Sequence, residues 1–481
     1  MRRVIASVSA SALPLAVAAA TFAVAVGLPA GDPDMWWHLA SGRWMIEHQD
    51  GLRVDVFSST ATGEPYALGQ WLGEVVLYQA YAFAGWTGVA VLRASLVALA
   101  AFAVTRLALR HASAWVAIPL ATAAIVLSTP TWTDRPQLFT LALFPVVLEL
   151  CLAARAGSRT ALIAAVGVVA FWANAHGGFA LGVGVLWIFA FEAVLERRRA
   201  LAPLAAAIVA TLVVSAEPGA LSLLRTIGHV AGPTARIVEE SPVDPLTPFG
   251  MLFALFVGAT LLVLMVRGGS LLGALMLAPV LLLALSAQRH VPLFGFAAVP
   301  FLAGPIAAWA HEVGPTLKRR GQRADRSDQR PAGDPGVPSS FSRSRLALPL
   351  VGALWLGALV SITTAAPGPD LRAYPVGAVG ALASSGGIVL NEYDWGGYLI
   401  WAVPSRPVFV DGRLYPFVDN GVIRQYQDAV LVLPSWRAVI ARWNVSQALL
   451  RPDRALVQAL RDDGWTVRTQ GEGFVLLERA R

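Results

Sequence analysis

The stretch GDPDMWWHLASGRWMIEHQDGLRVDVFSSTATGEPYALGQWLGE, residues 31–74, decides how the rest of the chain is interpreted. An apolar run of membrane-spanning length precedes it, and another follows it. It is the longest polar segment in the first two thirds of the chain, and Asp32 and Asp34 stand directly at the end of the first apolar run. We therefore predict a loop outside the membrane that holds two carboxylates at the membrane surface.

The composition is that of a membrane protein. The chain has 481 residues, of which 56% are hydrophobic and 14% are charged, whereas soluble domains carry about 25% charged residues. Its mean hydropathy is +0.61. The single cysteine, Cys151, lies in an apolar run, which excludes a disulfide within the chain and a cysteine-based metal centre.

The positive charge has an ordinary explanation in membrane topology. The net charge is +7 and comes almost entirely from arginine, because Lys318 is the single lysine. In membrane proteins such an excess is expected in the cytoplasmic loops. We therefore predict membrane lipids, and no nucleic acid, as partners of the basic side chains.

Apolar runs of about 20 residues predict about eleven membrane-spanning helices. They lie at 5–28, 88–109, 113–129, 137–154, 160–176, 178–195, 201–216, 249–266, 270–287, 291–310 and 346–365. The first begins with MRR, as a signal peptide does, but its apolar part is longer than a signal-peptide core, so we expect an uncleaved helix. Residues 71–86 are less apolar and rich in aromatic side chains, which predicts an amphipathic helix at the membrane interface.

The arginines give the orientation, because cytoplasmic turns are the basic ones. With Arg2 and Arg3 in the cytoplasm, every second turn is basic. These turns hold Arg106, Arg110, Arg155, Arg159, Arg197, Arg198, Arg199, Arg267 and the stretch 316–345. We therefore predict a multi-pass protein of the cell membrane with a cytoplasmic N-terminus and its C-terminal part outside.

The chain divides into two predicted domains. Residues 1–366 form a transmembrane domain, which includes a first extracytoplasmic loop at 31–87 and a cytoplasmic Arg/Pro-rich linker at 316–345. Residues 367–481 have normal charge content and form a small extracytoplasmic α/β domain, of a size that supports one core. In it we predict strands in GIVLN, PVFVDGR, SQALLRP, WTVRTQ and FVLLER, with helices at 420–431, 435–443 and 455–461.

Asp34 allows two interpretations. If residues 35–48 form a helix, Asp34 stands near its N-terminus and His38 lies one turn later on the same face. Asp34 could simply cap the helix, with Trp36 and Trp37 in an interfacial aromatic belt. It could instead be a catalytic carboxylate, because a carboxylate at the membrane surface must be solvated, paired or part of a cavity.

Several motifs together carry a resemblance to a known family. GDPDMWWHLASGRWMIEH, followed by WLGEVVLYQAYAF, resembles the first external loop of GT-C membrane glycosyltransferases, which include oligosaccharyltransferase catalytic subunits and protein O-mannosyltransferases. The chain is more similar still to a bacterial subgroup of GT-C-like proteins. The shared motifs are DRPQ at 134–137, WANAHG at 172–177, RHVPLF at 289–294, YDWGGYLIW at 393–401 and FVDGR at 409–413.

This resemblance implies a GT-C-like α-helical fold with a small external α/β domain in the bacterial inner membrane. It implies hexosyl or pentosyl transfer from a polyprenyl-phosphate-linked donor to a glycan, lipid or protein acceptor at the outer face. An acidic residue of the first loop, Asp34 or Asp32, would be the general base. His38 would lie on the substrate side of the same helix.

Cationic side chains at predicted outer turns fit such a donor, because they run against the positive-inside trend and arginine binds phosphate bidentately. They are Arg135, His176, Arg289 and His290. The alternative is local pairing, of Arg135 with Asp134 and of Arg289 with a loop carboxylate. Asn174 could contact substrate, or it could form a buried polar knot with His176 between two helices.

The C-terminal motifs have a structural and a functional interpretation. Gly396 and Gly397 permit a tight turn, and the segment that ends in Arg413 could be a simple strand-end turn. In the functional interpretation, Asp394 or Arg413 contacts the acceptor across a cleft. The sequence leaves both open.

A divalent cation, Mg or Mn, is a further candidate. Asp32 and Asp34 offer two carboxylates, and Glu240 in the long outer loop could add a third, together with Glu239 or Asp244. Hard cations prefer such oxygen ligands. Two aspartates one residue apart are a weak signal, so no metal is predicted with certainty.

Other functions stay open. A polytopic glycan polymerase or ligase would need outer arginines, but not the acidic loop. A transporter of lipid-linked substrates predicts internal repeats and mid-depth charges, and few charges, such as Arg93 and Glu149, occur in the spans. A catalytically inactive scaffold is a further alternative. No GxGxxG, Walker, GxSxG or HExxH motif stands in a usable context, which argues against nucleotide chemistry.

Overall fold

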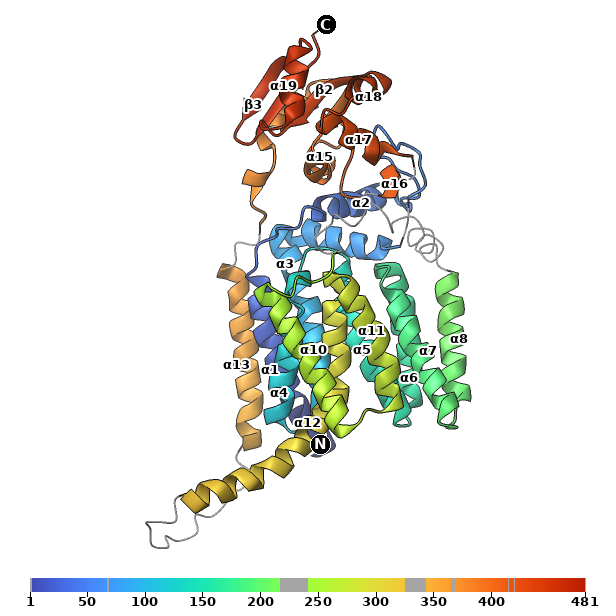
Figure 1. Cartoon of the computed structure of the whole chain (residues 1–481), viewed down its shortest axis with the longest axis vertical. Helices are drawn as coiled ribbons and strands as arrows, with labels where there is room; N and C mark the ends of the chain where they lie inside the picture. Colours follow the sequence, from blue (N-terminus) through green and yellow to red (C-terminus); the bar gives the residue numbers. More distant parts are fainter. Residues whose placement is uncertain are drawn as a thin grey trace.

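A bundle of roughly parallel helices carries a small α/β unit at one end. The computed structural model describes residues 2–66, 69–216, 241–324, 343–364, 368–413, 415–418 and 420–480. The N-terminus lies at the end of the bundle opposite the α/β unit, which holds the C-terminus (Figure 1).

A helix occupies each predicted span. The bundle helices are α1 (Arg2–Val26), α3 (Trp71–Leu109), α4 (Ala114–Val126), α5 (Gln137–Arg155), α6 (Arg159–Ala175), α7 (Phe179–Leu195), α8 (Leu201–Ser215), α10 (Pro248–Arg267), α11 (Leu271–Ser286), α12 (Val291–Ala324) and α13 (Arg343–Thr364). Four are long and apolar enough to cross a membrane, namely Trp71–Leu109, Gln137–Arg155, Pro248–Arg267 and Gln288–Glu312. The fold is thus that of a helical membrane protein, and the count of about eleven crossings stays a prediction.

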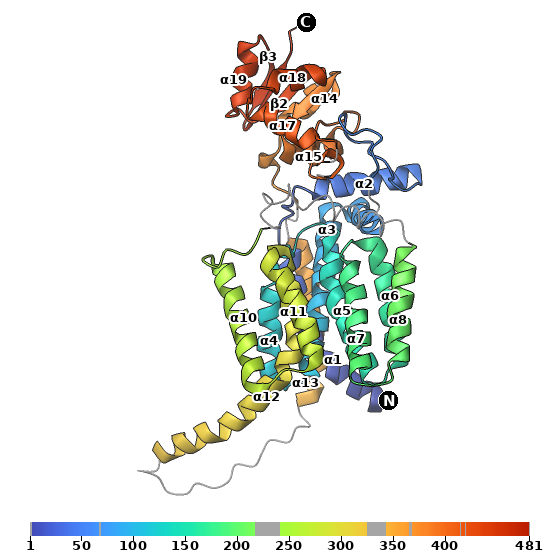
Figure 2. The ribbon, with the colours of Figure 1, turned by 45° about the vertical axis from the view of Figure 1, so that its right-hand side comes forward.

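Helix α3 contains the predicted interfacial helix. Its backbone breaks at Ala84 and Gly85, and Gly85 has a φ of 59°, which glycine adopts without strain. The part before the break lies across the end of the bundle, and the part after it runs down through the bundle (Figures 1 and 2). Helix α2 (Met35–His48) lies on this first part, between the bundle and the α/β unit.

The predicted linker at 316–345 is described only in part. Helix α12 continues to Ala324, so the beginning of that stretch is helical. Residues 325–342 lie outside the described residues.

The α/β unit contains a four-stranded sheet in the order β1-β2-β4-β3. Its strands are β1 (Ile388–Asn391), β2 (Val445–Leu450), β3 (Thr466–Gly471) and β4 (Phe474–Glu478). β1 and β2 are parallel, and the other neighbours are antiparallel. Its helices are α14 (Val379–Ala383), α15 (Gly396–Ala402), α16 (Tyr415–Val418), α17 (Val422–Val430), α18 (Trp436–Arg442) and α19 (Ala455–Asp462).

The strand prediction for PVFVDGR was wrong. This segment makes only an isolated bridge, between Val408 and Ser58 of the first loop. Ser59 and Thr60 donate side-chain hydrogen bonds to the carbonyl oxygens of Val408 and Phe409. The consecutive apolar residues Val408, Phe409 and Val410 are therefore buried without belonging to the sheet, and the contact with Ser58, Ser59 and Thr60 binds the α/β unit to residues 31–66.

Candidate active site

An ion triad stands where α1 ends and α2 begins. The Nε of Arg135 donates to Asp32 Oδ2, and its Nη1 lies 3.1 Å from Asp34 Oδ2. The Asp32 side chain is 2% exposed, Arg135 is 18% exposed and Asp34 is 25% exposed. Asp32 is therefore the buried partner of Arg135, while the carboxylate of Asp34 is still accessible to molecules outside the protein.

The local backbone explains why the Asp34 carboxylate is not used as a helix cap. Asp32 Oδ1 accepts the backbone N–H of Asp34 at 2.9 Å, which closes a turn ahead of α2. Asp34 occupies the N-cap position with helical φ and ψ of −74° and −20°, and its side chain caps no N–H group. Capping side chains usually sit on extended backbone. The capping interpretation therefore does not apply.

His38 pairs with a residue that the sequence did not indicate. Its Nδ1 lies 3.0 Å from Glu74 Oε1, and both side chains are buried. Burial raises the pKa of Glu74 well above its usual value, and burial together with the charge of Arg135 lowers the pKa of His38. Burial thus acts on both side chains in the same sense, because it disfavours the charged form of each. The close approach requires Gly42, whose Cβ would overlap the Glu74 backbone.

His176 is a neutral imidazole at the end of α6. Its Nδ1 accepts hydrogen bonds from the Gly178 backbone N–H at 3.0 Å and the Thr140 hydroxyl at 2.7 Å. Burial, followed by the charges of Arg289 and Arg135, lowers the pKa of His176 to about 4. The proton of the neutral ring is therefore on Nε2. Two of the predicted cations thus act on one imidazole, at the end of the bundle that carries the α/β unit.

The remaining predicted residues of the bundle lie around this group. Asn174 Oδ1 accepts the Trp71 indole N–H at 2.8 Å, which links α6 to the first part of α3. His290 Nδ1 lies 3.2 Å from the Leu283 carbonyl oxygen. Arg289 is exposed beside it. Asn174 thus makes a polar link between helices, but its partner is Trp71 and not His176, with which the predicted polar knot would have been formed. The predicted contact of Asn174 with substrate stays a prediction.

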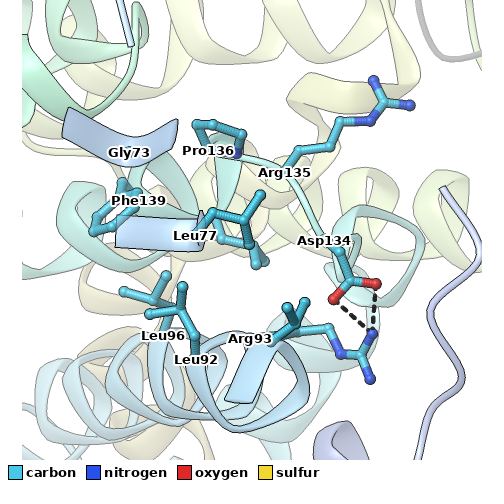
Figure 3. A pocket seen from close by; sticks show the side chains of 11 residues that line it. Gly73, Leu77, Leu92, Arg93, Leu96, Asp134, Arg135, Pro136 and Phe139 are labelled. Atoms are coloured by element: carbon cyan, nitrogen blue, oxygen red, sulfur yellow. Dashed lines mark hydrogen bonds and ion pairs between the residues drawn. The ribbon is translucent and has the colours of Figure 1, made fainter. Parts of the chain in front are cut away.

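A small hollow lies beside Arg135. Its cavity volume is about 10 Å³, which is about the space of one water molecule. Its walls come from the two parts of α3 and the start of α5, and they consist of Gly73, Leu77, Val89, Leu92, Arg93, Leu96, Asp134, Arg135, Pro136, Leu138 and Phe139. Figure 3 shows Arg135 pointing away from Asp134, which turns toward Arg93.

The predicted alternative of an Arg135–Asp134 pair does not occur. Asp134 binds Arg93 of α3, and both carboxylate oxygens lie 2.8 Å from its Nη1. Burial raises the pKa of Asp134 to about 6, although the charge of Arg93 opposes the rise. The sequence contained a signal for Arg93, because a charge inside an apolar span is costly and usually has a role.

The two C-terminal candidates occupy different environments. Arg413 is fully buried between Asp55 and Asp411, so its donors are engaged inside the protein. Asp394 is exposed and pairs with Arg451 at 2.9 Å. The turn between Asp411 and Arg413 nevertheless touches the triad, because a Cβ on Gly412 would overlap Asp34 Oδ1.

The described carboxylates fit an arginine better than a divalent cation. Asp32 and Asp34 both contact Arg135, and hard cations take about six or more oxygen ligands. Within the described residues, no three His, Cys, Asp or Glu side chains gather in a metal-binding group. Glu239 and Glu240 lie outside the described residues.

Comparison with known proteins gives matches in structure but not in sequence. No family model and no curated protein matches the chain. The oligosaccharyltransferase of Archaeoglobus fulgidus in its apo form has a TM-score of 0.58 at 12% identity, over 92% of this chain and 69% of that one. The same enzyme tethered with an acceptor peptide has a TM-score of 0.57 at 13% identity, over 92% and 69%.

ArnT from Cupriavidus metallidurans, bound to undecaprenyl phosphate, is similar over the whole length. Its TM-score is 0.51 at 16% identity, and the match covers 97% of both chains. Both neighbours are GT-C glycosyltransferases. The chain therefore has the GT-C fold.

Proposed function

We propose that this chain is a membrane glycosyltransferase that moves a sugar from a polyprenyl-phosphate-linked donor to an acceptor. The observation that carries the proposal is the partly exposed triad of Asp32, Asp34 and Arg135, in a GT-C fold. The ArnT neighbour is bound to undecaprenyl phosphate, and the oligosaccharyltransferase neighbour is tethered with an acceptor peptide. Fold alone does not imply function, so the proposal depends on the site.

Asp34 is the general base in this proposal, because its carboxylate is the more exposed of the two. The acceptor hydroxyl attacks the anomeric carbon of the donor sugar and gives its proton to Asp34. The bond between the anomeric carbon and the phosphate oxygen breaks, and the lipid phosphate leaves with that electron pair. The reaction inverts the anomeric configuration. Asp32 keeps Arg135 in place throughout.

The basic side chains bind the leaving phosphate. Arg135 lies at the triad, and the charges of Arg289 and Arg135 both contribute to the lowered pKa of His176, which supports a shared phosphate site. An arginine contributes charge-assisted hydrogen bonds to a phosphate, and His176 can donate from Nε2.

A matched set of aspartate variants tests the mechanism. Membranes containing the wild type, Asp34→Asn, Asp32→Asn or Asp50→Asn are incubated with undecaprenyl-phosphate hexoses and pentoses, and released undecaprenyl phosphate is measured by mass spectrometry. Asp50 is an exposed carboxylate of the same loop, so its variant should release lipid phosphate at the wild-type rate. Asp34→Asn should not. Full activity of Asp34→Asn would remove the proposed base, and binding without release by the wild type would favour a transporter.

The proposal also fixes the topology. The N-terminus is cytoplasmic, residues 1–366 form the membrane domain, and residues 367–481 form the α/β domain outside the bacterial inner membrane. Alkaline phosphatase fused to the C-terminus should be active, because it needs an oxidising exterior to form its disulfides. Green fluorescent protein at the same position should be dark. The reverse result would place the triad on the cytoplasmic side.

A further inference from the structure

A buried ion pair lies directly behind the triad. Arg93 and Asp134 are each 1% exposed. Arg93 stands about 12 Å along the helix beyond Gly85, inside the bundle. A charge at such a depth is costly unless it is paired and hydrogen-bonded. Stability alone therefore does not explain why this ion pair is buried here.

The same guanidinium binds the chain that leaves α1. Its Nε donates to the Ala25 carbonyl at 3.2 Å, its Nη1 lies 3.5 Å from the Pro29 carbonyl, and its Nη2 donates to the Leu28 carbonyl. Ala25 belongs to the last turn of α1, and Leu28 and Pro29 follow the helix end. One side chain can reach all three carbonyls, because arginine carries five N–H donors in a rigid fork.

These contacts reach both sides of the triad. Pro29 lies three residues before Asp32, and Asp134 immediately precedes Arg135. One side chain on α3 therefore fixes the two backbone segments that carry the opposite charges of the triad. We infer that Arg93 and Asp134 are positioning residues that place the carboxylates and Arg135 for glycosyl transfer. This inference rests on the proposed function.

A second ion pair on α3 provides a comparison. Arg106 lies 2.8 Å from Glu149, and these side chains are 39% and 13% exposed. That pair is near the opposite end of the helix and ties no described segment to the triad. A purely stabilising pair could be placed there at lower cost, because exposed pairs lose little solvation.

Binding of undecaprenyl phosphate tests the inference with the purified full chain in lipid nanodiscs. Arg93→Lys keeps the charge but cannot bridge the carboxylate and the three carbonyls. Its affinity for undecaprenyl phosphate, measured by native mass spectrometry, should fall by about tenfold. Deuterium exchange at residues 27–36 and 133–137 should become faster. Arg106→Lys, the matched control, should change neither.

A double-mutant cycle separates positioning from general damage. If Arg93 acts through Arg135, the double variant Arg93→Lys/Arg135→Gln should bind no more weakly than Arg135→Gln alone. Losses that multiply would overturn the inference, as would wild-type affinity and wild-type exchange in Arg93→Lys. If Arg93→Lys does not fold, Asp134→Glu takes its place, because it keeps the carboxylate but adds one methylene group between it and the backbone that carries Arg135.

The same data separate the inference from the proposed function. If the wild type does not bind undecaprenyl phosphate, the proposed function fails. If Arg135→Gln weakens binding while Arg93→Lys binds normally, only the positioning role fails.

Discussion

Two clusters of one arginine and two aspartates join the first loop to the rest of the molecule, and they differ in access. The accessible cluster consists of Asp32, Asp34 and Arg135, and the sealed cluster consists of Asp55, Asp411 and Arg413. Side chains of the accessible cluster are 2%, 25% and 18% exposed, whereas all three side chains of the sealed cluster are 0% exposed. The same side chains can therefore serve a reactive site or a structural clamp.

Saturation of hydrogen bonds explains the difference. In the sealed cluster, Nε and Nη2 of Arg413 each lie 2.7 Å from an oxygen of Asp411, and Nη1 binds Asp55. Asp55 also accepts hydrogen bonds from the Ser58 N–H and hydroxyl. Aromatic rings pack against the guanidinium. Such a cluster holds two segments together, whereas the side chain of Asp34 in the accessible cluster is 25% exposed, which the proposed role as a base requires.

The largest expected effect is a loss of activity, and it concerns the accessible cluster. Asp34→Asn should lower the rate of undecaprenyl phosphate release by about 10²- to 10⁴-fold, the usual contribution of a general base. Its thermal unfolding should stay close to that of the wild type, because Asp34 is partly exposed. Initial rates in membranes and melting curves of the purified protein measure the two effects. A large loss of stability with unchanged turnover per folded molecule would contradict the comparison.

The second effect is on stability. Arg413→Ala leaves two buried carboxylates without their partner, which should destabilise the fold by about 3–5 kcal/mol. Protease cleavage within the first loop and within the α/β unit should become faster, because the contact between them is lost. Arg437→Ala, which removes an exposed ion pair with Asp463, is the control and should change stability by about 1 kcal/mol or less. Equal effects of the two variants would refute the clamp.

The sequence predicted the helices well but not the side-chain partners. The predicted span 137–154 is nearly the observed Gln137–Arg155, because length and apolarity decide which segments enter a membrane. Arg93 binds Asp134 across 41 positions, and Arg413 binds Asp55 across 358. Such pairs depend on how segments pack after the chain folds. The pattern near one residue therefore favoured the wrong neighbour, Arg135, for Asp134.

Local pattern also failed where burial has a cause outside the segment. PVFVDGR has the apolar run of a buried strand, yet its apolar residues pack beside the sheet, and only Val408 makes a bridge. The sequence did not indicate Glu74 as the partner of His38, because the two residues lie on different helices. The fold could thus be predicted from hydropathy and motifs, whereas the roles of the charged residues required the contacts.

The third prediction concerns the point where the clusters meet. Gly412 belongs to the turn of the sealed cluster, and a Cβ there would overlap Asp34 Oδ1 and lie 3.2 Å from Trp37 Nε1. Gly412→Ala should therefore shift Asp34 and slow undecaprenyl phosphate release by about 10- to 100-fold. Gly386→Ala, where a Cβ meets nothing within 4 Å, is the control. Equal rates in the two variants would show that Asp34 does not act from this position.

The smallest effect tests the reach of Arg135. His176 has a folded pKa of about 4 against an ordinary value of 6.5, and Arg135 is the third cause after burial and Arg289. Arg135→Gln should raise the pKa of His176 slightly, by less than about one unit. One pKa unit corresponds to ~1.4 kcal/mol, so the energetic effect is smaller than that. Arg413→Gln should leave it unchanged. Carbon-13 resonances of labelled histidine rings, followed during a pH titration, measure the shift.

The sign of the accompanying stability change follows from linkage. The folded protein binds a proton at His176 less readily than the unfolded chain does, so this residue contributes stability above pH 6.5 that is lost as the pH falls toward 4. Removing Arg135 brings the two pKa values closer and should make that loss smaller. An acid loss in Arg135→Gln that is not smaller than in the wild type would mean that the charge of Arg135 does not act on His176. Arg135 and Arg289 would then not act on one imidazole, and a phosphate site shared by these two arginines would lose its support.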